Sequence, residues 1–411
     1  MSKTARFLPP PLPVLLTLLG LCAVLAAPAL AQPPATPPFD RTIIVGGGGT
    51  DLANGTALLT AVNDALAAVP PPSSTNPWLI KVEPGIFDLG SQTLQLQSWI
   101  DIEGSGRNAT FIRSAGTPFG ARPSTVNVAP GVDSELRNLT VQFFSNLSGT
   151  GIVNASSELK LTQLNVEVET AGSSTGIYSF NSNPRLSAVF PRVASTGGGE
   201  STGMLIRGGG PIINEMFFFI SSESPRENVG MIVERSADPV IDLVSGVVLG
   251  AAQNVGIRVQ GASARVTNNR WSVASGETAI GIQVLDSTTV DVAGDLSLKE
   301  STVDASLATR VIGLSNQSTQ VFVGVKDTIV TAIPAANSTL SVAARNTVNG
   351  ARTEVDQAVL VGKVSIENAV AGTTIRVGAT KLSGVRSIIA GSSAVCVASY
   401  DSTYAPIPLG C

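Results

Sequence analysis

Residues 151–154 read Gly-Ile-Val-Asn, and five similar segments follow along the middle of the chain. They are Gly176-Ile-Tyr-Ser, Gly203-Met-Leu-Ile, Gly230-Met-Ile-Val, Gly256-Ile-Arg-Val and Gly281-Ile-Gln-Val. Successive glycines lie 25 to 27 residues apart. So regular a period predicts one structural unit repeated many times, in which each copy buries its apolar face on the next.

Each unit contains three short apolar stretches, of which the glycine segment is the first. A second follows it, as at residues 159–161 and 240–241, and a third comes shortly after, as at residues 164–168 and 216–220. These stretches partly alternate and are rich in β-branched residues, a composition that favours strands. Gly, Ser, Asn, Thr and Pro separate them, as is typical of turns.

Three strands in about 26 residues exclude the other common repeat folds. Two-helix repeats need about 33 residues, and a propeller blade needs about 40 residues and four strands. The leucine-rich repeat has a suitable length, but its Leu-x-x-Leu-x-Leu pattern is missing. The remaining architecture is a parallel β-helix, in which each strand pairs with its equivalent in the next coil, about 4.8 Å away.

Both ends of a β-helix need a cap, because an open coil exposes apolar core and unpaired strand edges. Apolar residues at helical spacing predict an amphipathic cap helix over residues 57–69, which Pro70 terminates. With a preceding strand, residues 43–72 would form the N-terminal cap of a domain that spans residues 43–411. Residues 394–411 are expected to close the other end.

The N-terminus has the features of a secretory signal peptide over residues 1–31. Lys3 and Arg6 precede an apolar stretch over residues 14–27, and Ala-Leu-Ala at residues 29–31 is a small-residue cleavage site. Cleavage would leave a Pro-rich leader over residues 32–42 and no membrane span. An uncleaved membrane anchor is the alternative, although the apolar stretch is short for one. We therefore expect a secreted, periplasmic or cell-surface protein.

Composition agrees with an exported all-β chain of 411 residues, of which 43% are hydrophobic and 14% charged. After cleavage the chain would contain 24 Lys and Arg and 30 Asp and Glu, and this negative net charge does not favour nucleic-acid binding. Two cysteines would remain, Cys396 and Cys411, and an even number in an exported protein predicts a disulfide. Two free thiols are the alternative.

The start of the predicted domain carries three segments in a recognisable order. Residues 45–51 read Val-Gly-Gly-Gly-Gly-Thr-Asp before the cap helix, residues 79–87 read Leu-Ile-Lys-Val-Glu-Pro-Gly-Ile-Phe, and residues 100–106 read Ile-Asp-Ile-Glu-Gly-Ser-Gly. This order resembles the opening of the pectin lyase-like superfamily, and that of pectin methylesterases most of all. The resemblance covers residues 43–112 and implies a right-handed parallel β-helix.

The catalytic segments of pectin methylesterases are absent. The sequence contains no Gln-Asp-Thr-Leu, Asp-Phe-Ile-Phe-Gly or Gly-Arg-Pro-Trp segment, and Asp88 and Leu89 follow Phe87 where that family shows a Glu. The clustered aspartates with which pectate lyases bind calcium are not evident either. No catalytic residue is therefore carried over from the resemblance.

Other chemistry is limited by the residue types present. The chain has no histidine, which excludes Ser-His-Asp and Cys-His triads and most zinc sites. The tetraglycine at residues 46–49 does not fit a dinucleotide loop, because Asp51 breaks the pattern and no βαβ unit follows. We expect neither a cofactor nor a metal. Carboxylates on neighbouring coils remain as candidate acid and base groups, although Asp is also an ordinary turn residue. They are Asp238 with Asp242, and Asp286 with Asp291 and Asp295.

Alternation in the third strand predicts a row of outward-facing side chains. Phe190 and Arg192 alternate with apolar residues, and Phe217 and Phe219 hold the equivalent positions in the next coil. Aromatic side chains on an outer face suggest a surface that contacts a sugar or a partner protein. The alternative is that a loop or the chain terminus covers them.

Our first functional hypothesis is an exported, non-catalytic protein that binds polysaccharide or a cell-surface partner. The alternatives are a carbohydrate-active lyase or hydrolase of the pectin lyase-like superfamily and a subunit of a surface assembly. Two or three carboxylates with a basic residue in one outer groove would favour the enzyme.

Overall fold

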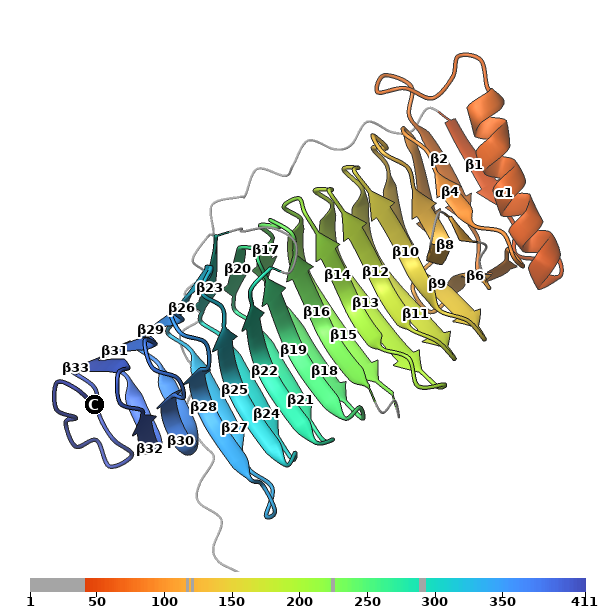
Figure 1. Ribbon diagram of the computed structural model, residues 1–411. Coiled ribbons are helices and arrows are strands. Elements are labelled where there is room, and N and C mark those ends of the chain that lie inside the picture. Colours follow the sequence, from red (N-terminus) through yellow and green to blue (C-terminus); the bar gives the residue numbers. More distant parts are fainter. Residues whose placement is uncertain (1–40, 116–117, 120–121, 223–225, 288–292) are drawn as a thin grey trace, which may run out of the picture. The chain divides into compact units, whose positions relative to one another are not determined.

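The computed structural model is a parallel β-helix whose coils follow one another from the N-terminal helix to the C-terminal tail (Figure 1). It describes residues 41–115, 118–119, 122–222, 226–287 and 293–411. The predicted signal peptide and nearly all of the Pro-rich leader lie outside the described residues. About 11 coils of about 26 residues each stack on one another. The predicted fold class, a right-handed parallel β-helix with a helix at its N-terminal end, is confirmed.

Three parallel faces, here named A, B and C, make up each coil, and the strands of one face pair from coil to coil. Face A contains β1 (Arg41–Val45), β2 (Trp78–Val82), β5 (Ile100–Gly104), the first parts of β9 (Glu135–Ser145), β11 (Lys160–Thr170), β13 (Arg185–Ser195) and β15 (Ile212–Ser221), then β17 (Val240–Asp242), β20 (Ala264–Thr267), β23 (Gly294–Lys299), β26 (Val321–Lys326), β29 (Arg352–Asp356), β31 (Thr374–Gly378) and β33 (Ser393–Val397).

The other two faces are built in the same way. Face B contains β3 (Gly85–Asp88), β6 (Thr110–Ser114), the second parts of β9, β11, β13 and β15, then β18 (Ser245–Leu249), β21 (Arg270–Ala274), β24 (Thr302–Ser306), β27 (Ile329–Ile333) and the first parts of β30 (Val359–Asn368) and β32 (Lys381–Ile388). Face C contains β4 (Leu94–Leu96), β8 (Arg122–Val128), β10 (Gly149–Ala155), β12 (Ser174–Phe180), β14 (Ser201–Arg207), β16 (Glu227–Glu234), β19 (Gln253–Gln260), β22 (Thr278–Leu285), β25 (Arg310–Gln317), β28 (Leu340–Asn346) and the second parts of β30 and β32. The short β7 (Pro118–Phe119) pairs antiparallel with β8.

From β9 onward, a non-glycine residue in the left-handed conformation makes the bend from face A to face B once in every coil. The left-handed conformation is uncommon in residues other than glycine, so its recurrence at this position marks a regular corner of the coil. The corner residues, with φ between 43° and 58°, are Asn138, Gln163, Ala188, Glu215, Leu243, Asn268, Glu300, Asp327, Gln357, Ala379 and Ala398.

The periodic glycines lie on face C inside strands. Gly151 is the third residue of β10, and its backbone is not left-handed. A Cβ added there would lie 2.5 Å from Cγ1 of Val166 on face B and 2.8 Å from the carbonyl oxygen of Gly176 in the next coil. These glycines therefore give room to the side chains that cross the core.

One apolar core runs through the coils from Val45 to Ile407. Equivalent positions of face C form a continuous column of buried side chains within it. That column contains Ile152, Ile177, Met204, Met231, Ile257, Ile282 and Leu314. Phe218 and Trp271 are among the largest buried side chains, and their rings stack with centroids 5.6 Å apart. Burial of this column holds successive coils together.

The N-terminal cap is α1 (Asp51–Ala67), which begins earlier and ends earlier than the helix expected over residues 57–69. Thr50 is the N-cap residue, and its side chain accepts a hydrogen bond from the Ala53 N–H. Leu58 is fully buried against the first coils, whereas Val69 lies beyond the helix and is 90% exposed. Figure 1 shows α1 beside β1 and β2 at this end of the solenoid.

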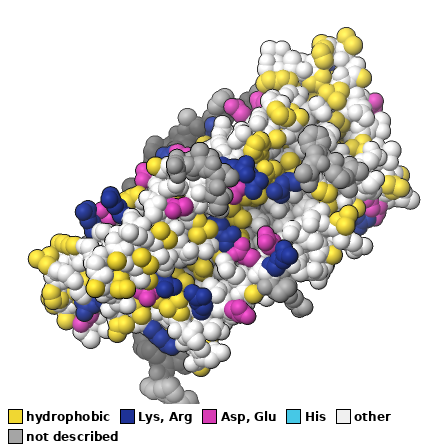
Figure 2. Space-filling model, viewed as in Figure 1, with side chains coloured by type: hydrophobic (Ala, Val, Ile, Leu, Met, Phe, Trp, Pro, Cys, Tyr) yellow, Lys and Arg dark blue, Asp and Glu magenta, His cyan; other side chains and the backbone are white. Residues whose placement is uncertain are grey.

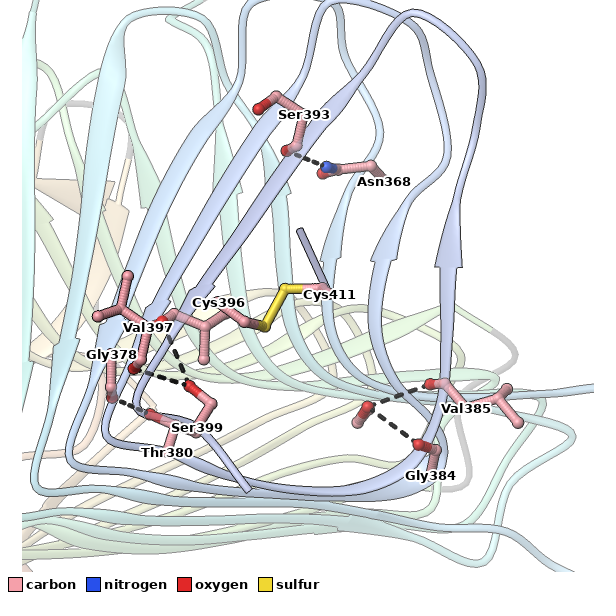
Figure 3. The surroundings of a disulfide bond; sticks show 12 residues. Asn368, Gly378, Thr380, Gly384, Val385, Ser393, Cys396, Val397, Ser399 and Cys411 are labelled. Atoms are coloured by element: carbon pink, nitrogen blue, oxygen red, sulfur yellow. Dashed lines mark hydrogen bonds between the residues drawn. A yellow bond between two sulfur atoms is a disulfide. The ribbon is translucent and has the colours of Figure 1, made fainter. Parts of the chain in front are cut away.

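The C-terminal cap is the tail that follows β33. Cys396 is buried in the core of the last coil and forms the predicted disulfide with Cys411, with Cα atoms 5.1 Å apart (Figure 3). Ile407 packs against the same core. The tail therefore covers the open end of the stack. Within the described ranges, no helix has both the length and the apolar character needed to cross a membrane.

Candidate functional site

The four predicted binding residues lie together on face B, where β13 and β15 run side by side. Arg192 and Phe217 are exposed, while Phe190 and Phe219 are half-buried, and all four alternate with buried core residues. Arg192 is in register with Phe219 in the next coil. The four side chains therefore have the outward orientation that alternation predicts for them.

A row of polar side chains leads up to these aromatics, one residue in each successive coil. The row consists of Asp88, Arg113, Gln142, Glu167 and Arg192, and the next position in register is Phe219. Nη2 of Arg113 donates to Oδ2 of Asp88 at 2.9 Å, and Nε2 of Gln142 donates to Oε2 of Glu167 at 2.8 Å. Within the described ranges Arg192 has no hydrogen bond or ion pair, so its guanidinium is available to a ligand.

Most of this row was missed by reasoning from the sequence. The signal was present, because Gln142, Glu167 and Arg192 follow one another at steps of 25 residues, the length of one coil. Asp88 and Arg113 have the same spacing. The sequence does not show, however, that the coils between these positions contain no insertion, and only then do the residues form one row.

Part of the aromatic surface is already covered. The guanidinium carbon of Arg107, from the turn between β5 and β6, lies 4.3 Å from the centroid of the Phe190 ring. That distance is typical of a cation–π contact. Phe217 is 39% exposed, so the aromatic surface open to solvent is centred on β15 and not on β13.

A depression of about 710 Å³ adjoins face B at its border with face C. Phe144 and Glu169, which point outward from β9 and β11, form one wall, and Leu147 and Thr196 contribute to the rest. Phe144 is 39% exposed. The aromatic and polar surface of face B therefore continues into a hollow.

A second group of charged residues lies on face A near the N-terminal end. Arg137 donates from Nη2 to Oε2 of Glu103 at 2.8 Å and from Nη1 to Oε2 of Glu135 at 2.6 Å. Oδ1 of Asp101 accepts the backbone N–H of Glu135 at 2.8 Å, and Oδ2 lies 3.9 Å from Arg137 Nη1. Three carboxylates and one basic residue therefore lie together, which is the combination of groups that would favour an enzyme.

Burial and the charge of Glu135 raise the pKa of Asp101, against the opposing effects of the Glu135 N–H and of Arg137. Burial lowers the pKa of Arg137, but its hydrogen bonds to Glu103 and Glu135 outweigh this and raise it. A carboxyl group with a raised pKa is a candidate proton donor. In the part of the chain that the structure describes, no group of Cys, Asp and Glu side chains could hold a metal ion.

The aspartates singled out as candidate acid and base groups make local contacts. Asp238 faces Arg265 at 3.4 Å, and Asp242 accepts hydrogen bonds from Thr267 and Asn268. Asp286 accepts hydrogen bonds from the turn over residues 318–320. Asp295 lies on face A in β23, and Asp291 lies outside the described residues. Asp238, Asp242 and Asp286 therefore act as turn and cross-coil partners.

Figure 2 shows acidic and basic side chains interspersed over the face in view, with no large area of one sign. Such a surface lacks the long-range attraction that concentrates a highly charged ligand.

Comparisons with known proteins add similarity in fold only. No protein-family model matches the sequence, and no curated protein matches it. Three similar solved structures are the A-module of a mannuronan C-5 epimerase from Azotobacter vinelandii (15% identity, 83% of this chain and 95% of that one, TM-score 0.40), a DFA-IIIase from Arthrobacter chlorophenolicus A6 in complex with DFA-III (13%, 90% and 97%, 0.48) and the Dettilon tailspike protein (11%, 86% and 68%, 0.43).

Proposed function

We propose that the protein is an exported, non-catalytic β-helix protein that binds polysaccharide on face B. The observation that carries the proposal is the grouping of Phe217, Phe219 and Arg192 on an exposed strand pair, next to a hollow lined by Phe144 and Glu169. The predicted signal peptide and the Cys396–Cys411 disulfide are compatible with an oxidising compartment outside the cytoplasm.

The chemistry of face B suits a sugar chain. Aromatic rings offer apolar faces to the C–H faces of sugars, while carboxylates, amides and guanidinium groups accept from and donate to hydroxyl groups. Successive coils repeat these contacts about every 4.8 Å, a step comparable to the length of one pyranose residue. The ligand class that we propose is therefore a polysaccharide that lies along or across the coils.

The test is a double substitution, Phe217→Ser with Phe219→Ser, in the full exported protein. We expect loss of binding to a panel of soluble polysaccharides, measured by affinity electrophoresis and isothermal titration calorimetry, with the melting temperature unchanged. Arg192→Ala should weaken binding about tenfold, because it removes one charged hydrogen-bond donor worth about 1.5 kcal/mol.

A matched control is Ile329→Ser. Ile329 is an exposed apolar residue that points outward from β27 on the same face, several coils away. Its replacement should leave binding unchanged. Unchanged binding by the Phe217/Phe219 variant would contradict the proposal, and a large fall in its melting temperature would show that the two rings belong to a covered surface.

A carbohydrate-active enzyme is the second candidate, because Asp101, Glu103 and Glu135 surround Arg137 and the pKa of Asp101 is raised. Here Asp101 would be the proton donor, and Glu135 a neighbouring carboxylate. The test is an assay for new reducing ends and for unsaturated products on neutral and acidic polysaccharides, with and without calcium. Activity that Asp101→Asn abolishes would replace the non-catalytic proposal.

A further inference from the structure

Face A is hollowed in the C-terminal half of the chain by three adjoining depressions. Their volumes are about 610, 290 and 510 Å³. The first two share Phe322 and Arg352, and the last two share Glu354 and Arg376. They therefore form one trough, which crosses β23, β26, β29, β31 and β33 at an angle to the strands. We refer to it as the face A trough.

A missing side chain deepens the third of these depressions, the one of about 510 Å³. Gly324 in β26 is in register with Ser297 in the previous coil and with Glu354 in the next. A Cβ added to Gly324 would lie 3.6 Å from Cε1 of Phe322, which is an ordinary contact distance, and its backbone is not left-handed. The backbone therefore does not require glycine here, and the hollow exists because no side chain fills it.

Phe322 supplies an aromatic surface beside that hollow. It points outward from β26, is 36% exposed and reaches toward Gly324. It is next to Asp295 in the previous coil, with which it is in register. A phenyl ring next to an open glycine offers an apolar surface on which a flat ligand can lie.

Charged groups of both signs surround the ring. Arg352 is exposed, and among the described residues its guanidinium forms no hydrogen bond or ion pair. Nη1 of Arg376 lies 3.1 Å from Oε1 of Glu354, in a pair of exposed side chains. Lys326 and Asp356 line the far part of the trough. The trough therefore offers hydrogen-bond donors on its basic side chains and acceptors on its acidic ones.

We propose that the face A trough is a second binding site, specific for a neutral oligosaccharide. The combination of an aromatic surface with both carboxylates and guanidinium groups fits a ligand that has C–H faces and many hydroxyl groups but no net charge. The trough is lined by three acidic residues, Glu354, Asp356 and Asp295, and by three basic ones, Arg352, Arg376 and Lys326. It therefore offers a polyanion no net attraction, and the whole protein is itself net negative. The site belongs to the same ligand class as the proposed function but uses none of its residues.

The test is calorimetric titration of the full protein with uncharged gluco-, manno- and galacto-oligosaccharides in 0.05 M and 0.5 M NaCl. We expect one of these series to bind with two independent sites. Phe322→Ser and Gly324→Gln should each remove one of the two sites, the first by deleting the ring and the second by filling the hollow. Arg352→Ala should weaken the same site about tenfold.

Gly324→Ala is the matched control, because a methyl group fits at ordinary contact distance. It should leave both sites and the melting temperature unchanged. Salt should change the affinity less than twofold, because screening acts on net charge and the ligand has none. A strong decrease of affinity in 0.5 M NaCl would overturn the assignment of a neutral ligand.

The two proposals fail separately in this experiment. If the Phe217/Phe219 variant loses all binding and the trough variants lose none, the face A trough is not a site and the proposed function stands. If the trough variants lose all binding and the Phe217/Phe219 variant loses none, face B is not the binding face. Absence of binding to every neutral oligosaccharide at millimolar concentration overturns the trough proposal.

Discussion

Gly230 of face C lies directly opposite the indole ring of Trp271 inside the coil stack. A Cβ added to Gly230 would overlap Cζ3 of the indole, and so would one added to Gly246, which is in register with Trp271 on face B. The largest side chain of the core therefore fits only because two glycines leave room for it. Packing therefore requires glycine at the periodic position, and the cost of a larger residue there depends on the side chain that it faces.

Gly230→Ala should destabilise the protein by about 1–3 kcal/mol, because the core around Trp271 has no space for a methyl group. The measurement is urea or thermal unfolding followed by circular dichroism. Gly324→Ala is the comparison, since its methyl group would point into the open face A trough, and its effect should stay within about 0.5 kcal/mol. Equal effects of the two substitutions would contradict this account of the repeat.

Cys411→Ser should loosen the C-terminal cap. The disulfide closes a loop with a sequence separation of 15 residues, for which chain entropy gives about 3 kcal/mol. Without it the tail that carries Ile407 should open more often, and amide hydrogen exchange should accelerate over residues 393–411 while the central coils keep their protection. Reduction of the wild-type protein should have the same effect. Faster exchange throughout the chain would show that the disulfide stabilises more than the cap.

Arg137→Met should destabilise the protein by about 3 kcal/mol at pH 7, because it leaves three half-buried carboxylates without their cation. The deficit should shrink as the pH falls toward 3, because protonation of Asp101, whose pKa burial raises, removes part of the unbalanced negative charge. Arg192→Met is the matched control, since Arg192 is exposed and has no ion pair in the described ranges, and its effect should stay within about 0.5 kcal/mol. Melting temperatures of both variants from pH 3 to pH 8 provide the comparison, and a deficit independent of pH would contradict the electrostatic explanation.

Asp286 should contribute to acid sensitivity. Burial raises its pKa, but hydrogen bonds from Ser318, Thr319 and Gln320 outweigh this and lower the pKa below 3.8. A lowered pKa in the folded state means that the contribution is present above pH 3.8 and is lost as the pH falls through the folded value. Asp286→Asn should therefore be less stable than the wild type at pH 6, and the difference should narrow toward pH 2.5. A stability difference between Asp286→Asn and the wild type that widens on acidification would contradict a lowered pKa of Asp286.

The class of fold was predictable because its main signal is local and repeated. The spacing of Gly151 and its five equivalents, together with strand-forming residues between turns, is compatible with few architectures. The position of those glycines within the strand was not predictable, because their role depends on side chains of another face, such as Val166 and Trp271. The corner residues were missed as well, since their types vary from Asn138 to Leu243 and only the backbone geometry unites them.

The candidate sites were harder to predict from the sequence than the fold. Alternation correctly predicted that Phe190, Arg192, Phe217 and Phe219 point outward, because side-chain direction in a strand has a period of two. It did not predict that Arg107 covers Phe190, a contact that joins turns and strands several coils apart. The face A trough was not foreseen either, because its coils differ in length and the register of Gly324 between Ser297 and Glu354 cannot be counted from a fixed period.

The sequence by itself therefore determined the coil, its three strands, the disulfide and the outward direction of alternate residues, all of which follow from local periodicity and composition. Only the tertiary structure decided which residues of different coils become neighbours. The physical reason is that each insertion between coils changes which residues of all later coils lie next to one another. Contacts such as that of Arg137 with Glu103, and the gap at Gly324 beside Phe322, therefore exist only once the coils are stacked.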